Sequence, residues 1–357
     1  MLAVLGLMTI YSAHADWGRQ MLWLALGCVA YICAAAIDYR RLRVLAPGLY
    51  VAMLLMLVAV HLIGHSALGA RRWLSIAGFP LEPSELSKLV LVVVLAAHLS
   101  RYERLTWRGF VGALLLVAPA AYLIFTQPDL GTTIVIVAVL LGLLFLGGAR
   151  PLHWGAIAGS AAIAFPLLPH VLHGYQKQRL EIFLDPSKDP LGAGYNLLQA
   201  RIAVGAGGLF GQGWLHGLQG QLGFVPERAT DFVFAVFAEQ FGLLGSLLLL
   251  AMFGALLIRL LHSAAVAPDR FGQLVVGGVA LLLFVQVVQN VGMNIGLLPI
   301  AGIPLPFISY GGSATVTSLT ALGIVQSVAM RRRTVKHRDP VPLEIPDPAS
   351  GTVRVTL

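Results

Sequence analysis

Long hydrophobic stretches recur along the whole of this chain, and they constrain its fold more than any other feature. Because the hydrocarbon core of a bilayer is about 30 Å thick, a helix needs about 20 mostly apolar residues to cross it. Of the 357 residues, 58% are hydrophobic and 11% charged, and the mean hydropathy is +0.83, outside the usual range of soluble domains. We predict an all-α, polytopic integral membrane bundle of about ten transmembrane helices, at 1–13, 17–37, 44–63, 84–99, 107–125, 130–147, 153–172, 231–258, 271–298 and 311–330.

Lysine and arginine are distributed unequally between the expected loops, which predicts the orientation of the chain. If the N-terminus is cytoplasmic, the inner loops hold fourteen of these residues and the outer loops eight, of which five lie in 173–230. We therefore expect a multi-pass protein of the cytoplasmic membrane with both termini in the cytoplasm. The net charge of +8 is mostly this topology signal, and no aromatic-interleaved basic patch for nucleic acid is present. Membrane lipids are the expected partners.

One transmembrane domain is expected over residues 1–330, because no soluble segment is long enough to fold alone. The stretch 1–13 is too short to cross unaided at about 1.5 Å per residue, so either its neighbours help it or the natural chain starts upstream. Residues 331–357 carry five basic residues in their first eight and then four prolines. This composition predicts a flexible cytoplasmic tail.

The longest interruption, 173–230, is expected to be a large extracytoplasmic loop between helices 7 and 8. Loops of this length are commonly functional. The glycines in 205–213 follow no strand, so we interpret them as tight re-entrant turns and not as a phosphate-binding fingerprint. Within 194–204, four apolar residues alternate with polar ones in a pattern typical of a short helix along the membrane surface: Leu197, Leu198, Ile202 and Ala203.

Ionisable side chains in or beside membrane spans are rare, so each one marks a candidate site. In "PSELSKL" (83–89), Pro83 and Ser84 predict a helix start with Ser84 as the N-cap. Glu85 and Lys88 then share one helix face. Two interpretations stay open: a buried ion pair that fixes helix packing, or a lysine that helps bind an anionic ligand.

The residues before this helix are candidates for the same outer pocket. Arg71 or Arg72 would join Lys88 there, and Trp73 is either an interfacial belt residue or a platform on which a sugar stacks. Further along, "QPDLGTT" (127–133) places Asp129 at an outer helix junction. We interpret Asp129 as a helix cap.

Asp231 stands at the outer start of the eighth expected span, in "ERATDFVFAVFAEQFG" (227–242). A helix N-terminus stabilises a carboxylate by about 0.3–1 kcal/mol, so a cap is one interpretation. Glu227 lies one turn before Asp231 with Arg228 next to it, which raises the alternative of a catalytic or metal-binding acid. The residues alone leave both open. Glu239, deeper in the span, is expected to be a packing group with a hydrogen-bond partner.

The segment before the last span combines amides, prolines and serines. Asn290 and Asn294 share a helix face, and the prolines that follow predict a re-entrant outer loop. Irregular backbone at membrane depth is tolerated only when it is buried in protein or lines a cavity. The stretch from Ser309 to Ser313 offers N–H groups and hydroxyls at a helix start, which predicts an anion cradle.

Several long motifs, in order along nearly the whole chain, resemble the SEDS family (shape, elongation, division, sporulation) of cell-wall glycosyltransferases. They are "RRWL…PSELSKL", "QPDLGTT", "DPLGAGYNLLQARIAVGAGGLFGQG", "TDFVFAVFAEQFGLLG" and "NIGLLPIAGIPLPFISYGGSA". Within the family, "GIPLPFISYGG" and "DPLGAGYN" are more similar to the elongation member than to the division member.

The resemblance implies an inner-membrane peptidoglycan polymerase that joins lipid II units into glycan strands during cell elongation and sets cell shape. It implies a class B penicillin-binding protein, a transpeptidase, as partner. The essential acid of the family falls on Asp231, its functional Glu and Lys on Glu85 and Lys88, and its motif Trp on Trp73.

Such chemistry needs cations to hold a diphosphate leaving group in a water-poor site. Lys88, Arg179 and either Arg71 or Arg72 are the expected cations, and Asp231 is expected to act as a base or to hold a divalent ion, Mg²⁺ or Mn²⁺. No organic cofactor is expected.

Two rival functions use the same residues. A lipid II flippase would need polar groups reachable from both sides of the membrane, whereas the deep polar residues cluster at outer helix ends. A scaffold that only recruits a crosslinking enzyme would make no polymer by itself.

Overall fold

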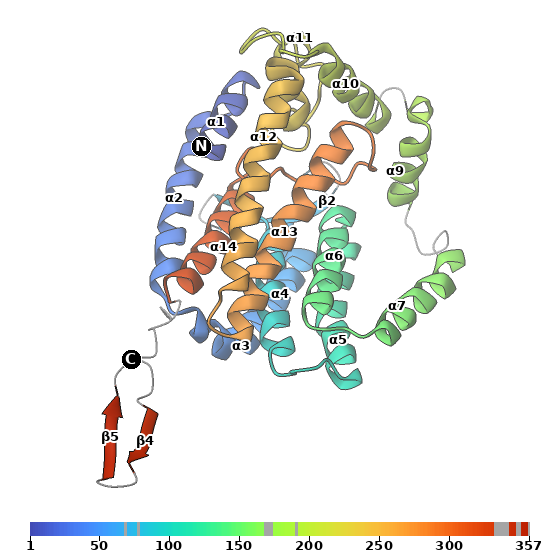
Figure 1. Cartoon of the computed structure of the whole chain (residues 1–357). Helices are drawn as coiled ribbons and strands as arrows, with labels where there is room; N and C mark the ends of the chain where they lie inside the picture. The colour runs from blue at the N-terminus through green and yellow to red at the C-terminus, as the bar shows by residue number, and fades with distance from the viewer. Residues whose placement is uncertain are drawn as a thin grey trace.

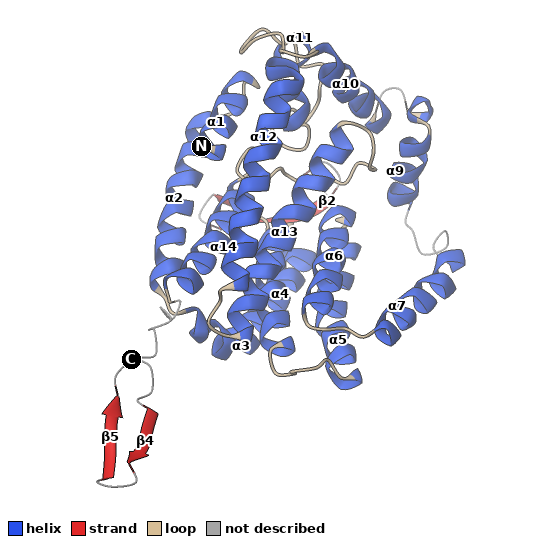
Figure 2. Ribbon diagram, viewed as in Figure 1, coloured by secondary structure: helices blue, strands red, loops and turns tan. Residues whose placement is uncertain are grey.

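The computed structural model describes residues 1–67, 70–76, 79–167, 174–189, 192–331, 343–347 and 351–355. Most of its helices run side by side in one bundle, with short elements gathered at one end (Figures 1 and 2). The helices matching the expected spans are α1 (Leu2–Ser12), α2 (Trp17–Ala36), α3 (Tyr39–Ile63), α4 (Pro83–Leu99), α5 (Trp107–Thr126), α6 (Leu130–Leu146), α7 (Pro151–Ala164), α12 (Val233–Ala265), α13 (Arg270–Asn294) and α14 (Gly312–Met330).

The predicted all-α membrane bundle is confirmed, since each predicted stretch contains a helix. Among the described helices, six are long and apolar enough to cross a membrane by length and composition: α2, α3, α5, α12, α13 and α14. The first helix has 11 residues, which agrees with the expectation that 1–13 is short. We call the end of the bundle at which α2, α4 and α14 begin the site end, and the opposite end the basic end.

Two helix boundaries differ from the prediction for local reasons. The third helix begins at Tyr39 and not at 44, because Asp38 caps it by accepting a hydrogen bond from Arg40 N over 2.9 Å. The seventh ends at Ala164 and not at 172; a short 3₁₀ turn, η1 (Phe165–Leu167), contains Pro166, and proline disrupts a helix interior. The rest of that predicted stretch lies outside the described residues.

The centre of the bundle is α4, which is buried along most of its length. Its apolar side chains belong to one large core shared with α3, α5, α6, α13 and α14. By contrast, α7 buries only His153, whose ring stacks on Phe110 at a centroid distance of 4.8 Å. Figure 1 shows α7 at the edge of the bundle, joined to it at its first turn.

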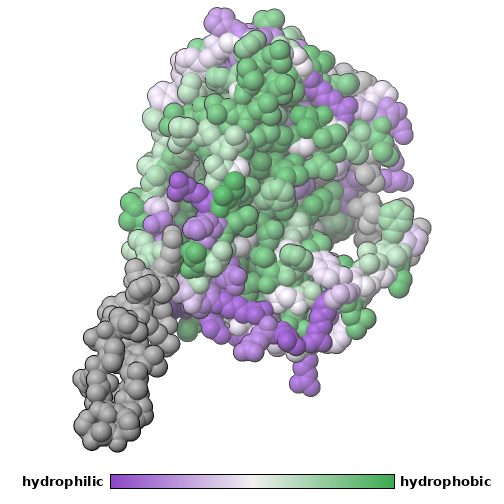
Figure 3. Space-filling view, viewed as in Figure 1, coloured by the Kyte–Doolittle hydropathy of each residue, from purple (hydrophilic) through white to green (hydrophobic). Residues whose placement is uncertain are grey.

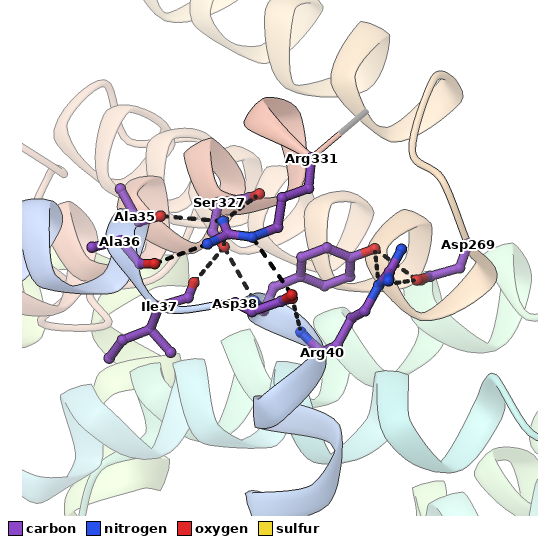
Figure 4. A network of polar contacts seen from close by, with 9 residues as sticks. Ala35, Ala36, Ile37, Asp38, Arg40, Asp269, Ser327 and Arg331 are labelled. Carbon is purple, nitrogen blue, oxygen red and sulfur yellow. Dashed lines mark hydrogen bonds and ion pairs between the residues drawn. The ribbon is translucent and has the colours of Figure 1, made fainter. Parts of the chain in front are cut away.

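A polar network closes the basic end (Figure 4). Arg331 donates hydrogen bonds to the carbonyl oxygens of Ala35 and Ala36, at 3.3 and 2.8 Å, and so satisfies groups that the end of α2 leaves open. The Ser327 hydroxyl donates to Ile37 O over 2.6 Å. Tyr39 OH donates to Asp269 over 2.6 Å. The turn between α2 and α3 is therefore tied to α14 and to the start of α13.

The site end carries the departures from plain helix. An antiparallel sheet of β1 (His65–Ala67), β2 (Ala70–Ile76) and β3 (Phe79–Leu81) joins α3 to α4. The predicted loop 173–230 contains α9 (Gly174–Leu184), η2 (Pro186–Lys188), α10 (Ala193–Ala206) and α11 (Leu218–Gln221). Asp185 caps η2, and hydrogen bonds from the hydroxyl and backbone N–H of Ser187 lower the pKa of its carboxyl.

The predicted surface helix at 194–204 is present as α10, and its four apolar residues divide between two environments. Leu197 and Ala203 are fully buried, in a small core with Phe232 and Met293, because α10 packs on α12 and α13. Leu198 and Ile202 are the exposed apolar residues. The helix is thus packed on one side and open on another.

The predicted tail, 331–357, falls largely outside the described residues. Beyond Arg331, its described parts are β4 (Leu343–Asp347) and β5 (Gly351–Val355), which pair as an antiparallel hairpin.

Candidate active site

A cavity of about 380 Å³ opens at the site end. Segments far apart in the sequence form its wall: the start of α2, β2 and β3, the start of α4, α9, α10, the turn before α12 and the loop before α14. The polar and aromatic lining residues are Arg19, Trp23, Trp73, Glu82, Glu85, Arg179, Asn196, Glu227, Thr230, Asp231, Phe232, Tyr310 and Ser313. Acids and guanidinium groups therefore share one hollow.

Asp231 lies in the turn that leads into α12. The carbonyl groups of this turn accept hydrogen bonds from α13 and from the loop before α14. Asp231 O accepts hydrogen bonds from the side-chain amides of Asn290, at 2.9 Å, and Asn294, at 3.1 Å. The neighbouring carbonyls accept from Ser309 Oγ, to Thr230 O over 2.6 Å, and from Tyr310 N, to Ala229 O over 2.7 Å. We call Asn290, Asn294, Ser309 and Tyr310 the carbonyl clamp. It fixes the backbone that carries the Asp231 carboxylate.

Arg179 and Asp231 approach the same point of the cavity wall, the α-carbon of Gly302. A Cβ placed on Gly302 would lie 3.4 Å from Asp231 Oδ2 and 3.9 Å from Arg179 Nη1. Arg179 Nη1 also donates a hydrogen bond to Ile300 O over 3.0 Å. Gly302 has φ +68°, a conformation that favours glycine. A predicted acid and a predicted cation are thus brought together across a residue without a side chain.

Glu85 and Lys88 form a buried ion pair, with Lys88 Nζ 2.6 Å from Glu85 Oε1 and side-chain exposures of 1% for the lysine and 5% for the acid. Glu85 lines the cavity, whereas Lys88 is not among the lining residues. The geometry of Lys88 therefore agrees with the interpretation as a buried ion pair. Glu85 is the member of the pair that faces the cavity. The predicted N-cap at Ser84 is wrong: Glu82 holds that position and Pro83 is the first helical residue, as its fixed φ favours.

The other predicted site residues divide into three groups. Trp73 and Ser313 line the cavity, and Ser313 Oγ accepts a hydrogen bond from Glu82 N over 2.9 Å. Ser309 is buried, and its hydroxyl also accepts from Leu305 N over 2.8 Å, so it serves the clamp. Arg71 and Arg72 lie in β2, but their side chains fall outside what the structure describes.

Two cavity residues on α2, Arg19 and Trp23, were not predicted. Their spacing of four residues puts them on one helix face, a signal that the sequence does contain. Gln20 holds this part of α2 in place, because its amide oxygen accepts from Gly311 N over 3.2 Å and its amide nitrogen donates to Thr315 over 2.9 Å.

Asp129 caps α6 as predicted, accepting a hydrogen bond from Thr132 N over 3.1 Å. Glu239 is fully buried and accepts from two backbone N–H groups, of Gln219 and Gly220, at 2.7 and 2.9 Å. Neither acid lines the cavity. Within the described ranges, no group of three or more His, Cys, Asp or Glu side chains is arranged to hold a metal.

A helical membrane bundle with a cavity at the ends of its helices, lined by four carboxylates and two guanidinium groups, defines a polar, membrane-embedded site. Residues 2–334 match the family FTSW_RODA_SPOVE, described as "Cell cycle protein". The chain belongs to this family, so the resemblance seen in the motifs is confirmed.

Curated relatives and solved structures agree with this assignment over nearly the full length. "Peptidoglycan glycosyltransferase MrdB" of Escherichia coli K12 is 41% identical over 350 residues, which cover 93% of each chain. "Stage V sporulation protein E" of Bacillus subtilis is 36% identical, covering 93% of this chain and 95% of that protein.

Two solved structures share the fold. A chain in a structure entitled "Structural coordination of polymerization and crosslinking by a peptidoglycan synthase complex" superposes with a TM-score of 0.82 at 32% identity, covering 93% of this chain and 96% of that one. The rod shape determining protein RodA of Thermus thermophilus gives a TM-score of 0.69 at 31% identity, covering 93% and 94%. The chain is a multi-pass membrane protein of the same architecture.

Proposed function

We propose that this protein is a peptidoglycan glycosyltransferase that polymerises lipid II into glycan strands at the outer face of the cytoplasmic membrane during cell elongation. Curated relatives along 93% of the chain are named peptidoglycan glycosyltransferases. The observation that carries the assignment of the site is the convergence of Asp231 and Arg179 on Gly302 inside the cavity.

The orientation follows from the charge distribution. Arg40, Arg270 and Arg331 lie at the basic end, which the positive-inside rule places in the cytoplasm. The end of α14 is then cytoplasmic, α1 runs towards the site end from the cytoplasmic side (Figure 1), and the cavity opens to the outer leaflet. All of its lining residues come from segments at the site end, which favours a reaction on one side of the membrane over a passage through it.

The chemistry uses the lining groups in distinct ways. A sugar hydroxyl of the acceptor attacks the anomeric carbon of the donor, and the bond from that carbon to the polyprenyl diphosphate breaks. Asp231 accepts the hydroxyl proton as the general base. The guanidinium groups of Arg179 and Arg19 offset the charge on the departing diphosphate, in a site where low dielectric strengthens each contact. Lys88 holds the Glu85 carboxylate in position at the wall.

A divalent cation is compatible with this site only as a shared ion. Mg²⁺ is commonly bound by one or two carboxylates plus substrate phosphates and water. Asp231 would therefore hold the ion from the protein side, and the diphosphate of the substrate would hold it from the other. Its chemistry would be charge neutralisation at the leaving group.

The partner in this proposal is a class B penicillin-binding protein, whose transpeptidase crosslinks the strands as they are made. The structural neighbour named for coordination of polymerization and crosslinking supports such a pairing.

The direct test is incubation of the purified protein with lipid II in proteoliposomes, with Mg²⁺, with Mn²⁺ and with a chelator, followed by glycan-length analysis on gels. We expect glycan strands from the protein alone. A parallel assay follows labelled lipid II between leaflets without a nucleotide or proton gradient. Transbilayer movement in the absence of any polymer would contradict the proposal and favour a flippase.

Substitution of Gly302 by Ala tests the approach of both Asp231 and Arg179 to this residue. The positive φ costs a residue with a Cβ about 1–2 kcal/mol, and the added methyl group would lie against Asp231 Oδ2 and Arg179 Nη1. We expect polymerisation to fall about tenfold or more, since about 1.4 kcal/mol in the transition state is a factor of ten. The matched control is Gly254→Ala, because Gly254 in α12 has open space around its Cα and should keep full activity.

A further inference from the structure

The helix that follows Asp231 is broken at Gly242, which has φ 66° and ψ −166°. The break divides α12 into a short helix, 233–241, and a long one, 243–265. A helix break leaves unpaired carbonyls on one side and unpaired N–H groups on the other, and in a membrane each such group is costly.

Residues 207–213, which we call the splint, supply the missing partners on both sides. Gln212 N donates to Glu239 O over 2.9 Å, and Gly213 N donates to Gln240 O over 3.0 Å. In the other direction, Leu243 N donates to Gly208 O over 2.9 Å and Leu244 N donates to Leu209 O over 3.1 Å. The splint therefore ends one helix and begins the next.

Glycines let the splint approach this closely. A Cβ on Gly207 would overlap the carbonyl oxygen of Ala238, and one on Gly211 would overlap that of Gln240. Gly208 and Gly211 also have positive φ angles, 52° and 81°. The glycine-rich stretch, which the sequence analysis interpreted as tight turns, thus allows close backbone packing of residues 207–213 against the break in α12.

The outward side of the splint is apolar. Leu209 is 60% exposed and Phe210 is 79% exposed. The first turns of the long helix beside it expose Leu243, Leu244 and Leu247 at 49, 53 and 52%. In Figure 3 the hydrophobic surface continues upward along α12 to the end of the bundle without a polar band across it.

These positions place the splint at the edge of the hydrocarbon. A helix over 243–265 is about 34 Å long at about 1.5 Å per residue, which is enough to cross the bilayer core by itself. Leu243 and Leu244 then stand at one boundary of the core, and Leu209 and Phe210 stand at the same level because the backbones are hydrogen-bonded.

We propose that Leu209 and Phe210 insert among the acyl chains of the outer leaflet, so that the splint anchors the short helix 233–241, and with it Asp231, at the membrane surface. The occupant of this apolar surface is lipid, because the surface continues that of a helix which must itself face lipid. Assignment to the outer leaflet rests on the proposed function, whereas insertion into lipid does not.

Spin labelling tests the insertion without any activity measurement. Cys28 and Cys33, both exposed, are first replaced by Ala. A nitroxide is then attached in Phe210→Cys, in Leu247→Cys as the lipid reference and in Lys188→Cys as the water reference, since Lys188 is an exposed charge in η2. In lipid vesicles, a nitroxide that faces lipid collides often with dissolved oxygen, which concentrates in the hydrocarbon. A nitroxide that faces water collides often with a water-soluble nickel chelate.

We expect the label at 210 to collide several-fold more with oxygen than with nickel, as at 247, but at a shallower depth. A nickel accessibility equal to that at 188 would overturn the proposal even if the protein polymerises lipid II normally. Conversely, a lipid-exposed label in a protein that makes no glycan would leave the insertion standing and reject the proposed function.

The consequence for catalysis is tested with Phe210→Asp, which we expect to lower polymerisation about tenfold at unchanged melting temperature. A charged side chain is costly in hydrocarbon, so residue 210 should move out of the membrane and displace the short helix 233–241 with it. Phe210→Leu should retain activity. Full activity of Phe210→Asp would overturn the anchoring role, and a variant that fails to fold leaves the decision to the label at 210.

Discussion

Asp231→Asn is expected to insert and fold normally and to make no measurable glycan from purified lipid II. The amide has the same shape as the carboxylate but cannot accept the acceptor proton, and a general base contributes about 10²–10⁴-fold to a rate. The carbonyl clamp binds the backbone of residues 229–231, so the turn should keep its position. Gel analysis of the polymer, with melting temperature as the check on folding, measures the effect.

The matched control is Asp185→Asn, the same chemical change in another acid of the segment between α7 and α12. Asp185 does not line the cavity, and this variant should polymerise lipid II at the normal rate. Retained polymerisation by Asp231→Asn would reject the assignment of the site. If the role is metal binding, the activity of Asp231→Asn should recover partly as Mg²⁺ or Mn²⁺ is raised, whereas a lost base is not restored by either ion.

Most of the bundle could be predicted because a spanning helix is determined locally, by about 20 apolar residues in a row. The break at Gly242 could not, since the apolar stretch continues on both sides of it. Only the bonds from residues 207–213 make the interruption stable, and that segment lies about thirty positions earlier in the chain. The environment of α10 could not be predicted for the same reason: Leu197 is buried by packing against α12 and α13, which periodicity alone does not show.

The candidate site shows the same limit. Residue types indicated Asp231, Glu85, Trp73, Arg179 and Ser313 one at a time, and the structure brings all of them to one cavity. Sequence spacing relates only neighbours in the chain, so it could not show that Lys88 lies behind Glu85 or that the Ser309 hydroxyl is used by the turn before α12.

Asn290 and Asn294 were expected to share a helix face, and both side-chain amides donate to Asp231 O. Substitution of Asn294 is therefore expected to have the second large effect on activity. Asn294 makes four hydrogen bonds in this region. Its amide nitrogen donates to Asp231 O, at 3.1 Å, and to the O and Oδ1 atoms of Asn290, at 2.8 and 3.4 Å, and its oxygen accepts from Ala235 N, at 3.1 Å. It is fully buried. Its loss removes one of the two hydrogen bonds to Asp231 O, which keeps the bond from Asn290, and one partner of Ala235 N, which keeps Phe232 O. Each lost hydrogen bond contributes about 0.5–1.5 kcal/mol.

Asn294→Ala is expected to lower kcat for polymerisation by about 10–100-fold, while KM for lipid II changes little. A shift of the Asp231 base that raises the activation free energy by about 1.4 kcal/mol lowers the rate tenfold. Asn294 is a positioning residue, since it reaches the reaction only through Asp231. Gln286→Ala is the matched control: Gln286 is a buried amide on the same helix outside the carbonyl clamp, and its loss should change the melting temperature without separating kcat from KM. An equal fall in kcat for both variants, or a rise in KM alone for Asn294→Ala, would show that Asn294 only supports the fold.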